Sequence, residues 1–130
     1  GCASSRRAPV PVPPPMVLGA FEADYGGSYS ISGAEWRHGS KSRYRIAYWR
    51  AEQQSPIAQN DSGNATEPGL WSRIDWMPLP GMPPYTWGFC MTAYGAASAA
   101  AAESTPAARR EVPRTGCNGF PFSRMKRRPS

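Results

Sequence analysis

Apolar and polar residues alternate with a period of two along several short stretches of this chain, as they do in half-buried β-strands. In one stretch Tyr44, Ile46 and Tyr48 alternate with arginines, so one face of the strand is expected to be buried and the other wet. The stretches are residues 17–25, 29–36, 43–49, 70–77 and 85–94. Turn-rich segments such as residues 60–69 separate them. The pattern therefore predicts a mainly β fold, a small antiparallel meander or barrel-like sheet.

One segment departs from the strand pattern. Residues 95–104 are rich in alanine, which has the highest helix propensity, and Pro106 is expected to stop the helix soon after. The chain also contains 15 prolines and 13 glycines, which disfavour a helical bundle because both weaken the interiors of regular elements. We therefore expect a single short α-helix beside the sheet.

Two cysteines lie in apolar sequence on either side of this alanine-rich segment. Cys90 belongs to the stretch 85–94, on the face opposite to Trp87, Phe89 and Met91, and Cys117 follows the helix. We predict that Cys90 and Cys117 form one structural disulfide that fastens the returning chain to the sheet. Disulfides persist in oxidising compartments, so the bond places the folded part outside the cytosol.

The composition divides the chain into three parts. Residues 1–15 form a proline-rich N-terminal arm, residues 16–123 the β-rich domain and residues 124–130 a basic C-terminal tail. The run of prolines in residues 8–15 predicts a polyproline II spacer. The two flanking parts are expected to be extended arms outside the core.

The net charge of +6 is concentrated toward the two ends of the sequence. Residues 16–105 hold six basic and eight acidic side chains, so the folded body is nearly neutral and a nucleic-acid partner is not expected. The basic ends suit an anionic membrane surface or an acidic protein partner, and solvated, disordered tails are the alternative. The residues predicted to bind a partner are Arg6, Arg7, Pro13, Pro14, Pro15, Arg124, Lys126, Arg127 and Arg128.

The first residues suggest a lipid anchor. Gly1-Cys2 resembles the end of a bacterial lipoprotein signal, with Cys2 as the acylated residue. A second interpretation is an N-myristoylation signal with a palmitoylated cysteine beside it, and a third is no lipid at all. No stretch approaches the roughly 20 apolar residues that a membrane-spanning helix needs.

The two cysteine motifs also carry a family resemblance. The segments Phe89-Cys90-x-Thr92-x-Tyr94 and Gly116-Cys117-Asn118-Gly119-Phe120, with Gly69-Leu70-Trp71-Ser72-Arg73-Ile74-Asp75-Trp76, resemble a family of small uncharacterised bacterial exported proteins. Its members look like predicted lipoproteins, and the similarity covers residues 18–123. Met91 and Asn118 differ from the family pattern, which has glutamine and glycine there. The resemblance implies a location in the periplasm or on the outer face of a bacterial membrane and implies no activity.

Few residues are candidates for chemistry. His38 is the only histidine, and the three cysteines lack metal-ligand spacing, so neither a metal nor a cofactor is expected. Asp61 and Asp75 are the candidate carboxylate pair, although Asp75 is better explained as a structural ion pair with Arg73 or Arg45. Because no nucleophile with a base is evident, the sequence predicts no enzyme and no small-molecule substrate.

Two functions follow from these features. The first is a non-enzymatic, membrane-anchored accessory subunit that stabilises a larger respiratory, photosynthetic or secretion complex by wrapping its extended arms around a partner. The alternative is a small β-barrel lipoprotein that binds an apolar or carbohydrate ligand among its aromatic residues. Filling of a small core is the stronger explanation of the five tryptophans.

Overall fold

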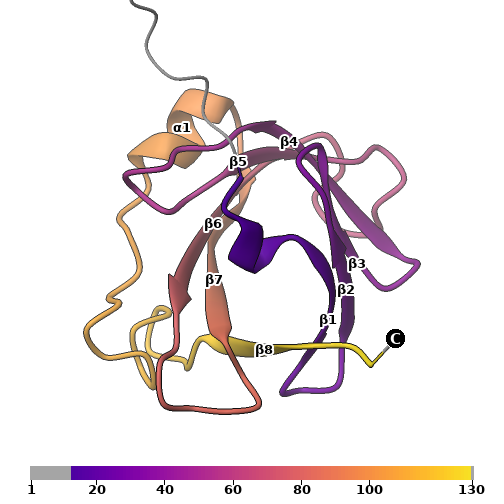
Figure 1. Cartoon of the computed structure of the whole chain (residues 1–130). Helices are drawn as coiled ribbons and strands as arrows, with labels where there is room; N and C mark the ends of the chain where they lie inside the picture. The colour runs from indigo at the N-terminus through magenta and orange to yellow at the C-terminus, as the bar shows by residue number, and fades with distance from the viewer. Residues whose placement is uncertain (1–12, 130) are drawn as a thin grey trace, which may run out of the picture.

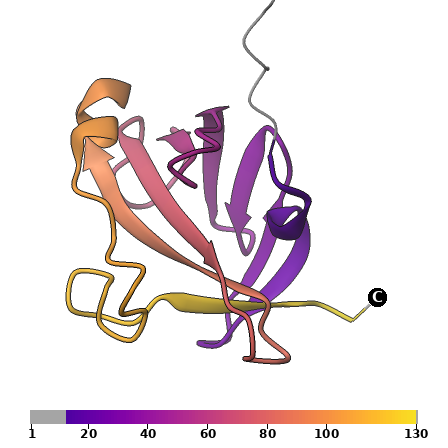
Figure 2. The same ribbon diagram turned by 60° about the vertical axis from the view of Figure 1, so that its left-hand side comes forward.

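The computed structural model describes residues 13–129 of the chain. This part folds into a closed barrel in which each strand pairs antiparallel with the next and the last strand returns to the first (Figures 1 and 2). The predicted antiparallel β fold with a short α-helix and a Cys90–Cys117 disulfide is confirmed. The strands are β1 (Gly19–Ala23), β2 (Ser28–Ile31), β3 (Glu35–His38), β4 (Ser42–Tyr48), β5 (Ile57–Asn60), β6 (Trp71–Pro78), β7 (Trp87–Ala96) and β8 (Ser123–Arg127), with the 3-10 turn η2 (Pro15–Val17) before β1 and helix α1 (Ala99–Ser104) after β7.

Alternate side chains of the strands point into the barrel and fill its middle with aromatic rings. Phe21, Trp36 and Trp87 are completely buried. The Trp87 ring contacts the other two edge to face, with ring centroids 5.2 Å from Phe21 and 5.8 Å from Trp36. Such edge-to-face contacts are favourable beyond the area they bury. The alternation in the sequence thus reflects a barrel interior built mainly from large rings.

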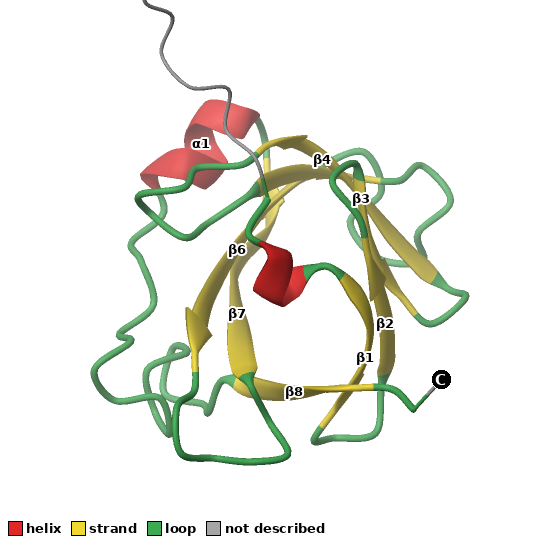
Figure 3. Ribbon diagram, viewed as in Figure 1, coloured by secondary structure: helices red, strands yellow, loops and turns green. Residues whose placement is uncertain are grey.

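The turn η2 lies across one mouth of the barrel (Figure 3). Pro15 occupies the start of this turn, where proline is favourable because its fixed φ suits the turn and its missing N–H is not needed. Val17 at its end is completely buried against the core. Pro15 was predicted to belong to the N-terminal arm, but it is part of the domain.

The predicted basic tail is wrong for most of its length, because Ser123–Arg127 form β8. This strand pairs with β7 on one side and with β1 on the other, and it closes the barrel. Met125 at its centre is completely buried beside Trp87. Burial of Met125 and the hydrogen bonds with β1 and β7 stabilise this strand more than its positive charges destabilise it. The neighbouring basic side chains extend outward or pair with nearby groups.

The predicted helix was too long at its N-terminal end. Gly95 and Ala96 continue β7, and α1 begins at Ala99 because the Ser98 side chain caps it by accepting a hydrogen bond from the Ala101 N–H at 3.1 Å. Part of the alanine-rich segment forms the end of β7, so the alanine run alone did not mark the boundary.

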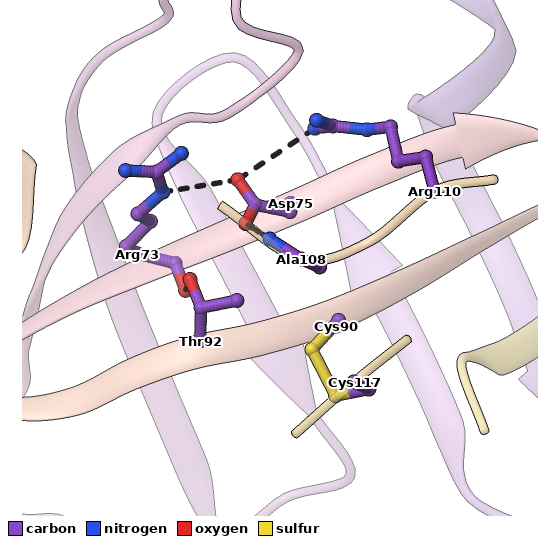
Figure 4. The surroundings of a disulfide bond; sticks show 7 residues. All are labelled: Arg73, Asp75, Cys90, Thr92, Ala108, Arg110 and Cys117. Atoms are coloured by element: carbon purple, nitrogen blue, oxygen red, sulfur yellow. Dashed lines mark hydrogen bonds and ion pairs between the residues drawn. A yellow bond between two sulfur atoms is a disulfide. The ribbon is translucent and has the colours of Figure 1, made fainter. Parts of the chain in front are cut away.

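After α1 the chain forms a strap (residues 105–122) that lies along the outer face of β6 and β7. A disulfide and several polar contacts attach the strap, and Figure 4 shows the disulfide and the contacts of Asp75. The disulfide joins Cys90 of β7 to Cys117. The Asp75 carboxylate of β6 accepts a hydrogen bond from the Ala108 N–H at 2.8 Å. The Arg110 guanidinium donates to the backbone carbonyls of β6 and of residues 53 and 54.

The strap covers a buried cluster of charges. Asp75 is completely buried, and its carboxylate lies 3.0 Å from Arg73 Nε and 3.6 Å from an Arg110 nitrogen. Burial lowers the pKa of Arg110, and the negative charge of Asp75 opposes that shift. The predicted ion pair of Asp75 with Arg73 is confirmed, whereas the alternative partner Arg45 lies opposite Glu35 and Gln59 on β4.

Gly116 is required by the tight fold of the strap. A Cβ atom at this position would overlap the backbone carbonyl of Arg109, whose N–H donates to the Gly116 carbonyl at 2.9 Å. We expect Gly116→Ala to lower the free energy of unfolding by about 1–3 kcal/mol, as overpacking of a filled site does. Gly33→Ala is the control, because its Cβ would meet only Pro13 at 3.6 Å. Urea unfolding measures both variants, and equal stability of the two would contradict this role.

Candidate functional site

The barrel wall is incomplete beside the second half of β7. Strand β8 pairs with β7 only from Trp87 to Phe89, so the edge of β7 from Cys90 onward has no partner from β8. A cavity of about 290 Å³, the aromatic cleft, opens at this place. Its lining residues are Tyr29, Trp36, His38, Tyr44, Phe89, Cys90, Met91, Tyr94, Cys117 and Ser123.

The rings of the aromatic cleft are held against one another. The Tyr29 and His38 rings, which are neighbours across β2 and β3, stack with centroids 4.4 Å apart and planes within 8° of parallel. The centroid of the Phe89 ring lies 5.3 Å from that of Tyr29 and 5.2 Å from that of Trp36. Both contacts are closer to edge-to-face than to stacked geometry. Gly27 leaves room for the stack, because a Cβ there would lie 2.9 Å from His38 Nε2. The aromatic cleft is therefore built on strands and is held by packing.

Two buried donors in the barrel lack an acceptor. The indole Nε1 atoms of Trp36 and Trp87 have no hydrogen-bond partner among residues 13–129. Both side chains are completely buried, but only Trp36 lines the aromatic cleft. An unpaired buried donor costs about 1–3 kcal/mol. The Trp36 N–H itself, like that of Trp87, has almost no solvent-accessible surface.

The Tyr29 side chain is partly buried. Burial, with smaller contributions from Tyr44 and Asp24, raises the pKa of Tyr29 to about 12. Burial and the hydrogen bond to Glu103 raise the pKa of Tyr48 to about 12 as well. Tyr29 is therefore a neutral hydrogen-bonding group in the aromatic cleft at ordinary pH.

This shift predicts a pH dependence. Between pH 10, the ordinary pKa of a tyrosine, and pH 12 an unfolded chain would ionise Tyr29 while the folded chain keeps its proton. Folding stability is therefore expected to fall as the pH rises through this window. In an alkaline titration followed by tyrosinate absorbance, Tyr29→Phe and Tyr48→Phe should each remove one phenol from the step near pH 12. An unchanged step in Tyr29→Phe would contradict the burial of this phenol.

Rings, hydroxyls and sulfur-containing side chains make up the described lining of the aromatic cleft. Among its described lining residues there is no aspartate, glutamate, lysine or arginine. The predicted carboxylate pair does not reach it: Asp75 is bound beneath the strap, and the Asp61 carboxylate accepts the Gly63 N–H at 2.9 Å. His38 stacks on Tyr29. Within residues 13–129, no three histidine, cysteine, aspartate or glutamate side chains are grouped so that they could hold a metal.

A second hollow, the apolar groove, lies where the strap meets the loops beside β1 and β6. Its volume is about 540 Å³, and its walls include Tyr25, Leu79, Met82 and Phe122. Tyr25 is 71% exposed. Arg124 lines the apolar groove, where it pairs with Asp24 at 2.8 Å and lies over the Tyr85 ring.

The residues predicted to bind a partner have different surroundings. Arg127 donates to the Leu18 carbonyl and lies over the Phe21 ring, and the Arg128 backbone N–H donates to the Ala20 carbonyl. Lys126 is partly buried in β8. Pro13 and Pro14 lead into η2, and Cys2, Arg6 and Arg7 lie outside the described residues. Partner binding by these residues stays a prediction.

The sequence suggested a ligand among the aromatic residues as an alternative, but it did not identify which of them line the aromatic cleft. Tyr29, Trp36 and Phe89 looked like core residues, and no local signal distinguishes a ring that borders a cavity from a ring that fills a core. The roles of Asn60 and Asn64 were also missed. Asn60 donates to the Glu67 and Tyr94 carbonyls, and Asn64 exchanges two hydrogen bonds with the Arg43 backbone, so both asparagines order the loop beside the aromatic cleft.

Comparison of the chain with protein-family models, with curated proteins and with solved structures finds no match. The resemblance to exported bacterial proteins therefore stays a prediction. Among the described residues, no helix combines the length and apolar character needed to cross a membrane.

Proposed function

We propose that this chain is a non-enzymatic binding protein that takes one small, uncharged ligand, apolar or carbohydrate, in the aromatic cleft. The observation that carries the proposal is a cavity of about 290 Å³ with rings on its walls and no charged residue among its described lining. Small-molecule sites are typically concave, mostly apolar and supplied with a few polar groups. The hydroxyls of Tyr29, Tyr44 and Ser123 and the His38 ring are such groups here.

The size of the barrel supports this proposal. An eight-stranded barrel is just wide enough either to be filled by side chains or to hold one small ligand. In this barrel Trp36, Trp87 and Phe21 fill the middle, and Val17 of η2 packs at one end. The remaining space lies on the side where β8 leaves the edge of β7.

The disulfide supports a location in an oxidising compartment, such as the periplasm or the outer face of a bacterial membrane. A binding protein in that place would meet its ligand before the ligand crosses the inner membrane. The proposed lipid on Cys2 would keep the barrel at the membrane surface.

The test is ligand titration of the purified, oxidised chain. Neutral monosaccharides and neutral one-ring and two-ring aromatic compounds are added at up to millimolar concentration, and amide and indole resonances are followed by NMR. We expect at least one of these two classes to shift the resonances of Trp36, Phe89 and Met91 together. Absence of any saturable shift from either class would overturn the proposal.

A matched pair of variants tests the location of binding. Met91→Trp places a larger side chain in the aromatic cleft and is expected to abolish the shifts. Met16→Trp makes the same change in η2, at a side chain that is 40% exposed, and should leave them intact. Equal binding by the two variants would show that the ligand occupies another place.

The predicted accessory subunit remains the second candidate, and the apolar groove favours it. Tyr25 on its wall and Phe120, next to Pro121 of its lining, are each 71% exposed, which is unusual for aromatic side chains unless a partner covers them. We expect Tyr25→Ser with Phe120→Ser to abolish co-purification of the tagged chain with a membrane complex from its host, and Met91→Trp to preserve it. Recovery of the unaltered chain only as a monomer would overturn this candidate.

A further inference from the structure

The apolar groove is larger than the aromatic cleft, and its volume of about 540 Å³ lies within the usual range for small-molecule sites. The β1–β2 turn, the β6–β7 loop and the strap build its walls, and the first two lie at the end of the molecule opposite to α1 (Figure 1). Leu79 and Phe122 are almost completely buried beside Gly88 of β7, whereas Tyr25 is 71% exposed. The apolar groove therefore has a buried apolar bottom and an exposed rim.

Three charged side chains line the apolar groove, and two of them form an ion pair. The Asp24 carboxylate accepts hydrogen bonds from the backbone N–H of Arg124 at 3.1 Å and from its Nε at 2.8 Å. This pair adds no net charge to the wall. The charge of the apolar groove therefore depends on the third side chain, Arg114.

Arg114 differs from the two other arginines of the strap. Arg109 pairs with Glu111 at 3.1 Å, and Arg110 lies 3.6 Å from the Asp75 carboxylate. The Arg114 side chain is exposed, and no hydrogen bond or ion pair joins it to another group among residues 13–129. A guanidinium can hold a carboxylate through two parallel hydrogen bonds. The apolar groove thus combines apolar walls with one positive charge that has no counter-charge of its own.

We propose that the apolar groove binds a free alkyl carboxylate of medium chain length, such as an eight-carbon fatty acid. The alkyl chain lies against Leu79, Met82 and Phe122, which remove it from water. Methionine adapts readily to a flexible occupant. The carboxylate pairs with Arg114. This site is separate from the aromatic cleft, so the inference goes beyond the proposed function and does not rest on it.

Octanoate, octan-1-ol and octylammonium provide a matched test, because the three molecules share an eight-carbon chain and differ in the charge of the head group. Each is titrated into the oxidised full chain at neutral pH, and the methyl resonances of Leu79 and Met82 are followed by NMR. We expect octanoate to bind about fivefold more tightly than octan-1-ol, which is the upper end for one ion pair in contact with solvent. Octylammonium should bind least tightly, because Arg114 repels its charge.

Two arginine variants of the strap locate the counter-charge. Arg114→Gln removes the charge, so the preference for octanoate over octan-1-ol should disappear while the affinity for octan-1-ol stays the same. Arg109→Gln makes the same change five residues away, at a side chain that is 73% exposed and does not line the apolar groove. It changes the net charge of the chain equally and should preserve the preference.

Two methionine variants locate the alkyl chain. Met82→Trp places a larger side chain in the apolar groove and should abolish the octanoate shifts of Leu79. Met91→Trp makes the same change in the aromatic cleft and should leave these shifts intact.

The possible failures are distinguishable. Equal affinity for the three compounds, or a preference for octanoate that survives Arg114→Gln, would overturn the role of Arg114. Loss of octanoate binding in Met91→Trp but not in Met82→Trp would overturn the location in the apolar groove. Absence of saturable octanoate shifts up to millimolar concentration would overturn the site altogether, and would leave the accessory subunit as the candidate in which this surface binds a protein.

Discussion

Replacing Asp75 with alanine is expected to lower the free energy of unfolding by about 3–5 kcal/mol, the usual cost of removing one partner from a buried ion pair. The carboxylate is completely buried, 3.0 Å from Arg73 Nε and 3.6 Å from an Arg110 nitrogen. Without it two guanidinium groups would face each other beneath the strap, and the Ala108 N–H would lose its acceptor. Urea unfolding followed by tryptophan fluorescence measures the change.

The chain contains a matched control for this prediction. Arg109 and Glu111 are also two residues apart and lie 3.1 Å from each other, but their side chains are 73% and 66% exposed. Solvent screens an exposed pair of this kind, so Glu111→Ala should leave stability unchanged within error. An equal loss of free energy of unfolding in the two variants would show that burial of the Asp75 cluster contributes nothing to the stability of the barrel.

Loss of the disulfide is expected to cost about 3.5 kcal/mol. The bond spans a sequence separation of 27 residues, and closing a loop of that length restricts the unfolded chain by about this amount in the chain-entropy account. The double variant Cys90→Ala with Cys117→Ala should therefore unfold at a lower urea concentration. The unaltered chain treated with a reductant should show a similar loss, and the reductant should not affect the double variant.

The disulfide and Asp75 hold the same strap, so their effects should not be independent. Once the bond is gone, the strap has fewer attachments to β6 and β7, and Asp75→Ala should cost less in that background than in the oxidised chain. A double-mutant cycle measures this coupling. If the two losses of free energy of unfolding simply add, each attachment holds its own part of the structure.

The strands were largely predictable because a half-buried strand has a period of two that local sequence displays. The alternation of Tyr44, Ile46 and Tyr48 with arginines follows β4, and Cys90 opposite Trp87 and Phe89 follows β7. The disulfide was predictable because both cysteines lie in apolar sequence that would otherwise have to leave a thiol buried. The strands depend on neighbours that are close in the sequence, and the disulfide on the local surroundings of each cysteine.

What could not be predicted depends on distant neighbours. The basic side chains around Met125 concealed β8, whose stability comes from ladders with β1 and β7. The partner Arg110 of Asp75 lies in a segment without regular structure, and its position is fixed only when the strap is attached. The aromatic cleft exists because β8 ends its pairing with β7 at Phe89, and that ending is a property of the whole barrel.

Closure of the barrel by its last strand has a consequence for the timing of folding. The ladder between β1 and β8 pairs Ala23 with Met125, and just beyond it the Arg124 N–H donates to the Asp24 carboxylate, 100 positions away. Strand β1 must therefore wait, half-paired, until residues 123–127 have been synthesised. Folds dominated by such distant pairings form slowly, so closure of the barrel is a late step of folding.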